Sequence, residues 1–111
     1  MAYPLYELEH RWGERVNLDL PVQVAVNSLS GIDGRVKNLS LSGALIEADI
    51  DLRIHSLIEI SVKLSRYPQR AVVIEAHVTR KQDGDVGVEF CEFAPKAIKD
   101  LMRALSIRLS P

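Results

Sequence analysis

The sequence VVIEAHVTRKQDGDVGVEF, residues 72–90, contains the clearest structural pattern in this chain. Apolar and polar side chains alternate from Val72 to Thr79 and again from Val86 to Phe90, as expected for strands with one buried face. Between the two runs, the residues Gln82-Asp83-Gly84-Asp85 form a strong hairpin signal, because the Asp-Gly pair tolerates the positive φ angles of a two-residue turn. The stretch therefore predicts an antiparallel β-hairpin that turns one face toward a core.

Four more short strands are predicted upstream of this hairpin, separated by turn-forming residues. The densest turn signal between them is SLSGIDG, Ser28 to Gly34, and Pro21 is expected at a strand edge or a bulge because it cannot donate to a ladder. The four predicted strands are Leu18–Asn27, the short run from Val36 to Asn38, Ala44–Ala48 and Ile58–Leu64.

The pattern changes after Phe90 from a period of two to a period of 3.6 residues. The apolar residues of this last segment are spaced as on one face of an amphipathic helix, and Pro95 suits its first turn. Six short strands followed by one helix predict an all-β fold, a closed or nearly closed six-stranded antiparallel barrel with the C-terminal helix as a lid. The apolar helix positions are Ile98, Leu101, Met102, Leu105 and Leu109.

Length and composition bound the domain organisation. The chain has 111 residues, enough for one domain. Residues 1–15 show no sustained periodicity and are expected to form a flexible N-terminal arm, whereas residues 16–111 are expected to form the barrel and its helix. A net charge of −1 argues against a nucleic-acid polymer as partner, because such binders are usually more basic.

The sequence also bears on compartment and metals. No apolar run approaches the roughly 20 residues of a membrane helix, and the first ten residues do not resemble a signal peptide, so no membrane insertion is expected. Cys91 is the single cysteine, which excludes an internal disulfide and a cysteine-based zinc site. These features favour a cytoplasmic protein without a metal cofactor.

Two polar stretches stand out against this scaffold. The first is HRWGER, residues 10–15, which places Arg11 and Arg15 four positions apart just before the first strand. A guanidinium is a planar fork that stays charged and grips phosphate or the O6/N7 edge of guanine with two hydrogen bonds. Trp12 can stack on a base or pack the arm onto the barrel. Arg11 and Arg15 are therefore candidate ligands for one compact anionic nucleotide.

The second stretch is NLSLSG, residues 38–43, between two predicted strands. The Asn38 amide can donate to and accept from a guanine edge, and the Ser40 hydroxyl can bond a base or a phosphate. If alternation continues through this stretch, Asn38 and Ser40 face outward together. Gly43 permits a backbone conformation or a close approach that a Cβ would block.

Together the RxxxR and NxSxxG patterns resemble the paired signature of PilZ domains, small bacterial β-barrels of which most sense cyclic di-GMP. The resemblance covers about residues 10–108 and includes Gly87-Val88-Glu89-Phe90, which looks like the GVxF stretch of the last barrel strand. It implies that Arg11 and Arg15 clamp cyclic di-GMP, and that the NxSxxG residues Asn38, Ser40 and Gly43 complete the pocket.

The resemblance also implies a receptor rather than an enzyme. The nucleotide would draw the arm onto the barrel and create a surface for a separate, unidentified effector protein in motility, exopolysaccharide, biofilm or virulence control. His10 stands where many members carry another arginine, a position associated with binding of one nucleotide or of a stacked pair. The stoichiometry of ligand binding is therefore open.

Three other readings remain. A PilZ-like adaptor that binds only protein is kept open by the acidic residues Glu7, Glu9 and Glu14 beside the arginines. An enzyme has poor candidates, because Cys91 with His77 is the best nucleophile–base pair on offer and the three histidines lack ligand spacing. A single-strand nucleic-acid barrel is disfavoured by an aromatic content of 5%.

Overall fold

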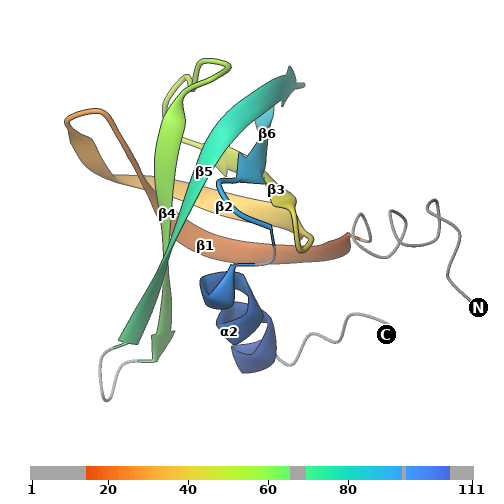
Figure 1. The fold of residues 1–111 in the computed structure, drawn as a ribbon. Helices are drawn as coiled ribbons and strands as arrows, with labels where there is room; N and C mark the ends of the chain where they lie inside the picture. Colours follow the sequence, from red (N-terminus) through yellow and green to blue (C-terminus); the bar gives the residue numbers. More distant parts are fainter. Residues whose placement is uncertain (1–14, 66–69, 94, 106–111) are drawn as a thin grey trace, which may run out of the picture.

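The strands predicted from alternation close into one barrel. The computed structural model describes residues 15–65, 70–93 and 95–105. In that part of the chain the strand order around the barrel is β1-β2-β3-β6-β5-β4, every neighbouring pair is antiparallel, and one helix follows (Figure 1). The predicted fold class is confirmed. The elements are β1 (Val16–Val26), β2 (Leu29–Leu39), β3 (Gly43–Ala48), β4 (Leu57–Ser65), β5 (Arg70–Gln82), β6 (Asp85–Phe90) and α2 (Lys96–Ala104).

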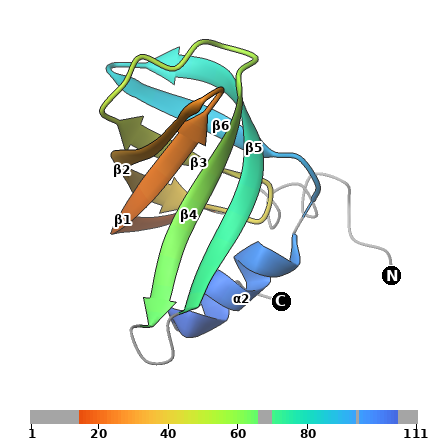
Figure 2. The same cartoon turned by 90° about the vertical axis from the view of Figure 1, so that its left-hand side faces the viewer.

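The core lies inside the barrel and between the barrel and α2. Alternate residues of every strand point inward, and Val24, Ile46 and Val78 are completely buried. Helix α2 lies beside β5 and buries its apolar face, with Ile98 and Leu101 almost inaccessible (Figures 1 and 2). Burial of each such aliphatic side chain contributes about 1.5–3 kcal/mol relative to exposure. The barrel and its helix therefore form one hydrophobic core.

The β5–β6 hairpin has the two-residue turn that its sequence predicts. Asp83 and Gly84 have φ angles of 49° and 85°, and the flanking residues Gln82 and Asp85 pair directly. Two positive φ angles in succession match the twist of the adjoining strands. This turn fixes which residues of β5 face β6, a point that matters for the site.

The first hairpin turns earlier than expected. The sequence predicts a turn over Ser28 to Gly34, but Asn27 and Ser28 alone form it and β2 begins at Leu29. Asn27 adopts a φ of 56°, which asparagine tolerates better than most residues. One extra β2 residue lies in the ladder near Gly31, whose φ is 68°, so the glycine sits in an irregular strand rather than in a turn.

Prolines mark a one-sided part of β1 and the start of α2. Pro21 pairs with Arg35 of β2, but the β1–β4 ladder starts only at Gln23, so Pro21 lies where β1 is paired on one side, as predicted. Pro95 is the N-cap of α2 rather than part of its first turn. The predicted helix extends to Leu109, and its residues 106–109 lie outside the described part. The division into an arm (1–15) and a barrel (16–111) stays a prediction.

Candidate functional site

Arg15 lies against the end of β2. It immediately precedes β1, and the antiparallel register pairs Val16 with Leu39 and Asn17 with Asn38. One terminal nitrogen of the Arg15 guanidinium donates a 2.9 Å hydrogen bond to the Asn38 side-chain oxygen. The barrel register thus brings together the last arginine of RxxxR and the first residue of NxSxxG.

The Arg15 guanidinium is in a partly desolvated, positive environment. Partial burial, and secondarily the positive charge of Arg80, lower the pKa of Arg15 from its usual value. A guanidinium nevertheless stays charged near neutral pH. An anion bound here would relieve the repulsion between Arg15 and Arg80.

Ser40 has a different position from the one expected. It is completely buried, and its hydroxyl oxygen accepts hydrogen bonds from the backbone amides of Ser42 and Gly43, each at 3.2 Å. The Ser40 hydroxyl can also donate to the Gly43 carbonyl at 3.2 Å, and the Ser40 amide donates to that carbonyl at 2.9 Å. The expectation that Asn38 and Ser40 face outward together is therefore wrong. Alternation holds only within a strand, and β2 ends at Leu39.

Gly43 is required for the close approach of two strands. A Cβ at this position would lie 2.2 Å from the Val88 carbonyl oxygen on β6, much nearer than any real contact. The preceding loop is also tied to β6, because the Phe90 amide donates to the Ser42 carbonyl at 2.8 Å. The Ser40–Gly43 loop is thus tied to β6 through Ser42 and Gly43.

An open hollow extends from Arg15 across the outer surface of β5 and β6. It adds Thr79 and Arg80 to the residues singled out from the sequence. The hairpin turn could have revealed them, because a two-residue turn at Asp83-Gly84 places Arg80 opposite Gly87 of the GVEF stretch. The residues that line this hollow are Arg15, Ser42, Gly43, Thr79, Arg80, Gly87, Val88 and Glu89.

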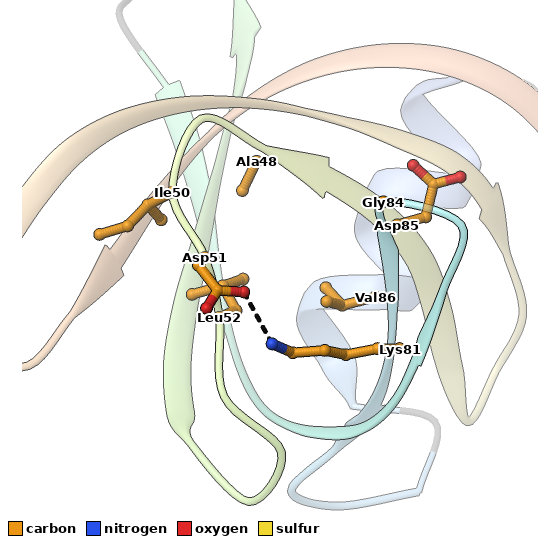
Figure 3. A pocket seen from close by; sticks show the side chains of 8 residues that line it. All are labelled: Ala48, Ile50, Asp51, Leu52, Lys81, Gly84, Asp85 and Val86. Carbon is orange, nitrogen blue, oxygen red and sulfur yellow. Dashed lines mark hydrogen bonds and ion pairs between the residues drawn. The ribbon is translucent and has the colours of Figure 1, made fainter.

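A second hollow lies between the β3–β4 connection and the β5–β6 hairpin (Figure 3). Its polar side chains are already paired: Lys81 contacts Asp51 at 2.7 Å, as the dashed line in Figure 3 marks, and Asp85 contacts Lys37 at 3.0 Å. The Lys81 ammonium lowers the pKa of Asp51, while hydrogen bonds to Asp85 and Glu47 raise that of Lys37. This hollow offers an anionic nucleotide no unpaired cation among the described residues that line it.

The remaining predicted site residues lie outside the described part of the chain. These are Arg11 and the two candidates beside it, His10 and Trp12. Their role in ligand binding stays a prediction.

The catalytic and metal candidates are not assembled into a site. His77 lies 3.9 Å from Glu89, and Cys91 is an exposed free thiol whose amide donates to Glu75. Over residues 15–65, 70–93 and 95–105, no group of three or more potential metal ligands is present. No helix in the same ranges is long and apolar enough to cross a bilayer.

Fold and site together define a small antiparallel β-barrel domain with a C-terminal helix and an arginine-bearing polar edge. The family model of the PilZ domain matches residues 9–107, nearly the whole chain, so the chain belongs to the PilZ domain family. PilZ domains are binding and adaptor domains, and the family is associated with cyclic di-GMP receptors, although some members do not bind this nucleotide.

The comparison of structures agrees on the fold. The chain is similar to a crystal structure of the PilZ domain of CeSA from a cellulose-synthesizing bacterium, with a TM-score of 0.67 and 19% sequence identity. The similarity covers 85% of this chain and 99% of the other. A search of curated proteins found no match.

Proposed function

We propose that this chain is a receptor for cyclic di-GMP that changes conformation on binding and signals to a separate effector protein. The observation that carries the proposal is the contact between Arg15 and Asn38, which joins the two signature motifs in one place. A guanidinium and an amide beside each other present several donors and an acceptor, which suit a guanine edge and a phosphate. Family membership supports this choice of ligand.

Each signature residue has a role in the proposal. Arg15 and Asn38 contact the nucleotide directly, and Arg11 joins them from the arm, with His10 and Trp12 as further candidates. Ser40 and Gly43, which the sequence suggested as ligands, contribute by holding the loop under Asn38 in a fixed shape, because both are buried. The proposed ligand set thus combines a rigid barrel edge with the chain that precedes β1.

The proposed output is a rearrangement of residues 1–15 on the barrel. Nucleotide binding to Arg11 and Arg15 would hold this segment against the β2–β3 loop and present a new surface to the effector. Control of motility, exopolysaccharide production, biofilm or virulence is proposed from family membership alone. The existence of a separate effector protein, the cytoplasmic location and the absence of a metal requirement stay predictions.

Calorimetric titration with cyclic di-GMP, with GTP and cyclic GMP as controls, tests the proposal. The double variant Arg11→Ala/Arg15→Ala should lose roughly 30-fold to 10⁴-fold in affinity, since each arginine contact contributes about 1–3 kcal/mol. Arg70→Ala, at the opposite end of β5 from the hollow, is the matched control and should bind like the wild type. Equal affinity of the double variant and the wild type would reject the assignment.

An adaptor that binds only protein is the second candidate function. Leu57 and Val73 are 61% and 51% exposed on the outer face of β4 and β5, where apolar side chains could contact a partner. A wild-type protein that shows no heat or spectral change with cyclic di-GMP would favour this function over the first.

Hydrogen exchange tests the conformational part separately. Residues 5–15 should become protected when cyclic di-GMP binds, because the arm then gains contacts that its own few apolar groups do not supply. Equal protection with and without the nucleotide would refute the rearrangement while leaving binding intact.

A further inference from the structure

Arg80 lies across the bare backbone of Gly87. A Cβ built on Gly87 would be 2.7 Å from both Cγ and Nε of Arg80 and 3.2 Å from Cδ. The arginine side chain therefore occupies the space that any larger residue at position 87 would fill. Arg80 also lines the hollow that contains Arg15, and its charge is close enough to lower the pKa of Arg15.

A bulge in β5 gives Arg80 this direction. The ladder pairs Val78 with Val88 and Arg80 with Gly87, so Thr79 is an extra residue on β5. Both Thr79 and Arg80 are exposed and line the hollow, although neighbouring strand residues normally point to opposite faces. Thr79 donates from its hydroxyl to the Gly87 carbonyl at 3.1 Å, which stabilises the bulge.

The charges of the hollow favour an anion. Arg15 and Arg80 are close enough for the charge of Arg80 to lower the pKa of Arg15, and neither forms an ion pair with another described residue. The one carboxylate in the lining, that of Glu89, lies 3.9 Å from Nε2 of His77. Two adjacent cations without a carboxylate partner are unfavourable together unless a ligand compensates them.

We propose that Arg80 is a third arginine of the nucleotide pocket and binds paired acceptor atoms of cyclic di-GMP, either phosphate oxygens or guanine O6 and N7. The inference rests on the proposed function and extends it from the two signature motifs to the β5 bulge. In this proposal Gly87 contributes to ligand binding as well as to the barrel, because the lack of a side chain leaves room for Arg80 over β6.

Variants of Arg80 separate a ligand role from a packing role. Arg80→Met keeps a long side chain over Gly87 but removes the charge, and should weaken cyclic di-GMP binding about 10- to 100-fold. Arg80→Lys keeps the charge without the two-pronged geometry and should fall between Met and wild type. Arg70→Ala, on the same strand, should bind normally. Equal thermal stability of all variants would confirm that they fold.

Two probes keep the outcomes distinct. If the wild type binds cyclic di-GMP and Arg15→Ala does not, but Arg80→Met binds like the wild type, the inference about Arg80 is wrong and the proposed function stands. If the wild type does not bind cyclic di-GMP, the proposed function is wrong. A titration with inorganic pyrophosphate then tests whether the hollow with Arg15 and Arg80 binds an anion at all. Pyrophosphate should shift the amide NMR signals of Thr79 and Gly87 in the wild type but not in Arg80→Met. If these signals do not move in the wild type, the anion site is wrong.

Discussion

The Arg15 guanidinium donates a 2.9 Å hydrogen bond to the Asn38 side-chain oxygen, joining residues 23 positions apart. The bond exists because β1 starts where β2 ends and the two strands are antiparallel. Asn38 therefore holds the Arg15 side chain at the edge of the hollow. Preorganisation of this kind reduces the conformational entropy lost when a ligand binds.

A double-mutant cycle on Arg15 and Asn38 measures this preorganisation. Arg15→Ala and Asn38→Ala should each lower cyclic di-GMP affinity, and the double variant should lose less than the sum of the two, because Asn38 acts partly through Arg15. The free energy of unfolding should change by less than about 1 kcal/mol, since the bond is exposed. Strictly additive losses in affinity would show that the two residues act independently.

Replacement of Ser40 should destabilise the barrel. Ser40→Ala leaves the half-buried amide of Ser42 and the buried amide of Gly43 without their shared acceptor, at a cost of about 1–3 kcal/mol. Ser42→Ala is the matched control. The Ser42 hydroxyl has a 3.3 Å contact with the Ser40 hydroxyl and no other hydrogen bond to the described residues, so this variant should lose less stability. Urea denaturation of the two variants compares them, and equal midpoints would contradict the role given to Ser40.

Glycines 31 and 43 should respond differently to alanine. Gly43→Ala forces a methyl group into the Val88 carbonyl, so β3 and β6 must separate, and we expect a loss above about 2 kcal/mol. Gly31→Ala meets no atom within 4 Å and should cost only about 1 kcal/mol through its positive φ. Thermal unfolding gives the order, and a more stable Gly43→Ala than Gly31→Ala would contradict it.

The Asp51–Lys81 pair provides a pH test of the second hollow. Lys81 lowers the pKa of Asp51 in the folded state, so the stabilisation from this pair is present above the unfolded pKa of about 3.9 and is lost as the pH falls through the folded value. In Lys81→Met the Asp51 carboxyl should titrate at a higher pH than in the wild type, as carboxyl NMR signals would report.

Nucleotide affinity should not change in that variant, because the Lys81 ammonium pairs within the hollow of Figure 3 and not within the one containing Arg15. A clear loss of cyclic di-GMP affinity in Lys81→Met would indicate that the nucleotide occupies the second hollow instead.

The fold could be predicted from the sequence because it depends on local patterns. Alternation in β1 and β4 to β6 marks the buried faces, and the Asp83-Gly84 turn sets one hairpin directly. The early β1–β2 turn was mispredicted, since residues 28–34 contain so many turn formers that the true turn at Asn27 was hidden. A glycine can serve a turn or a bulge equally well, and composition does not distinguish them.

From the sequence alone, the alternation, turn and helix patterns predict a barrel of six strands, a closing helix and the two polar motifs RxxxR and NxSxxG. The orientation of individual side chains depends instead on the folded barrel: Ser40 is buried, Arg15 donates to Asn38, and Arg80 lies over Gly87. The physical reason is that periodicity predicts a side chain's direction only inside a regular strand. Where a strand ends or bulges, contacts with the neighbouring strand decide that direction.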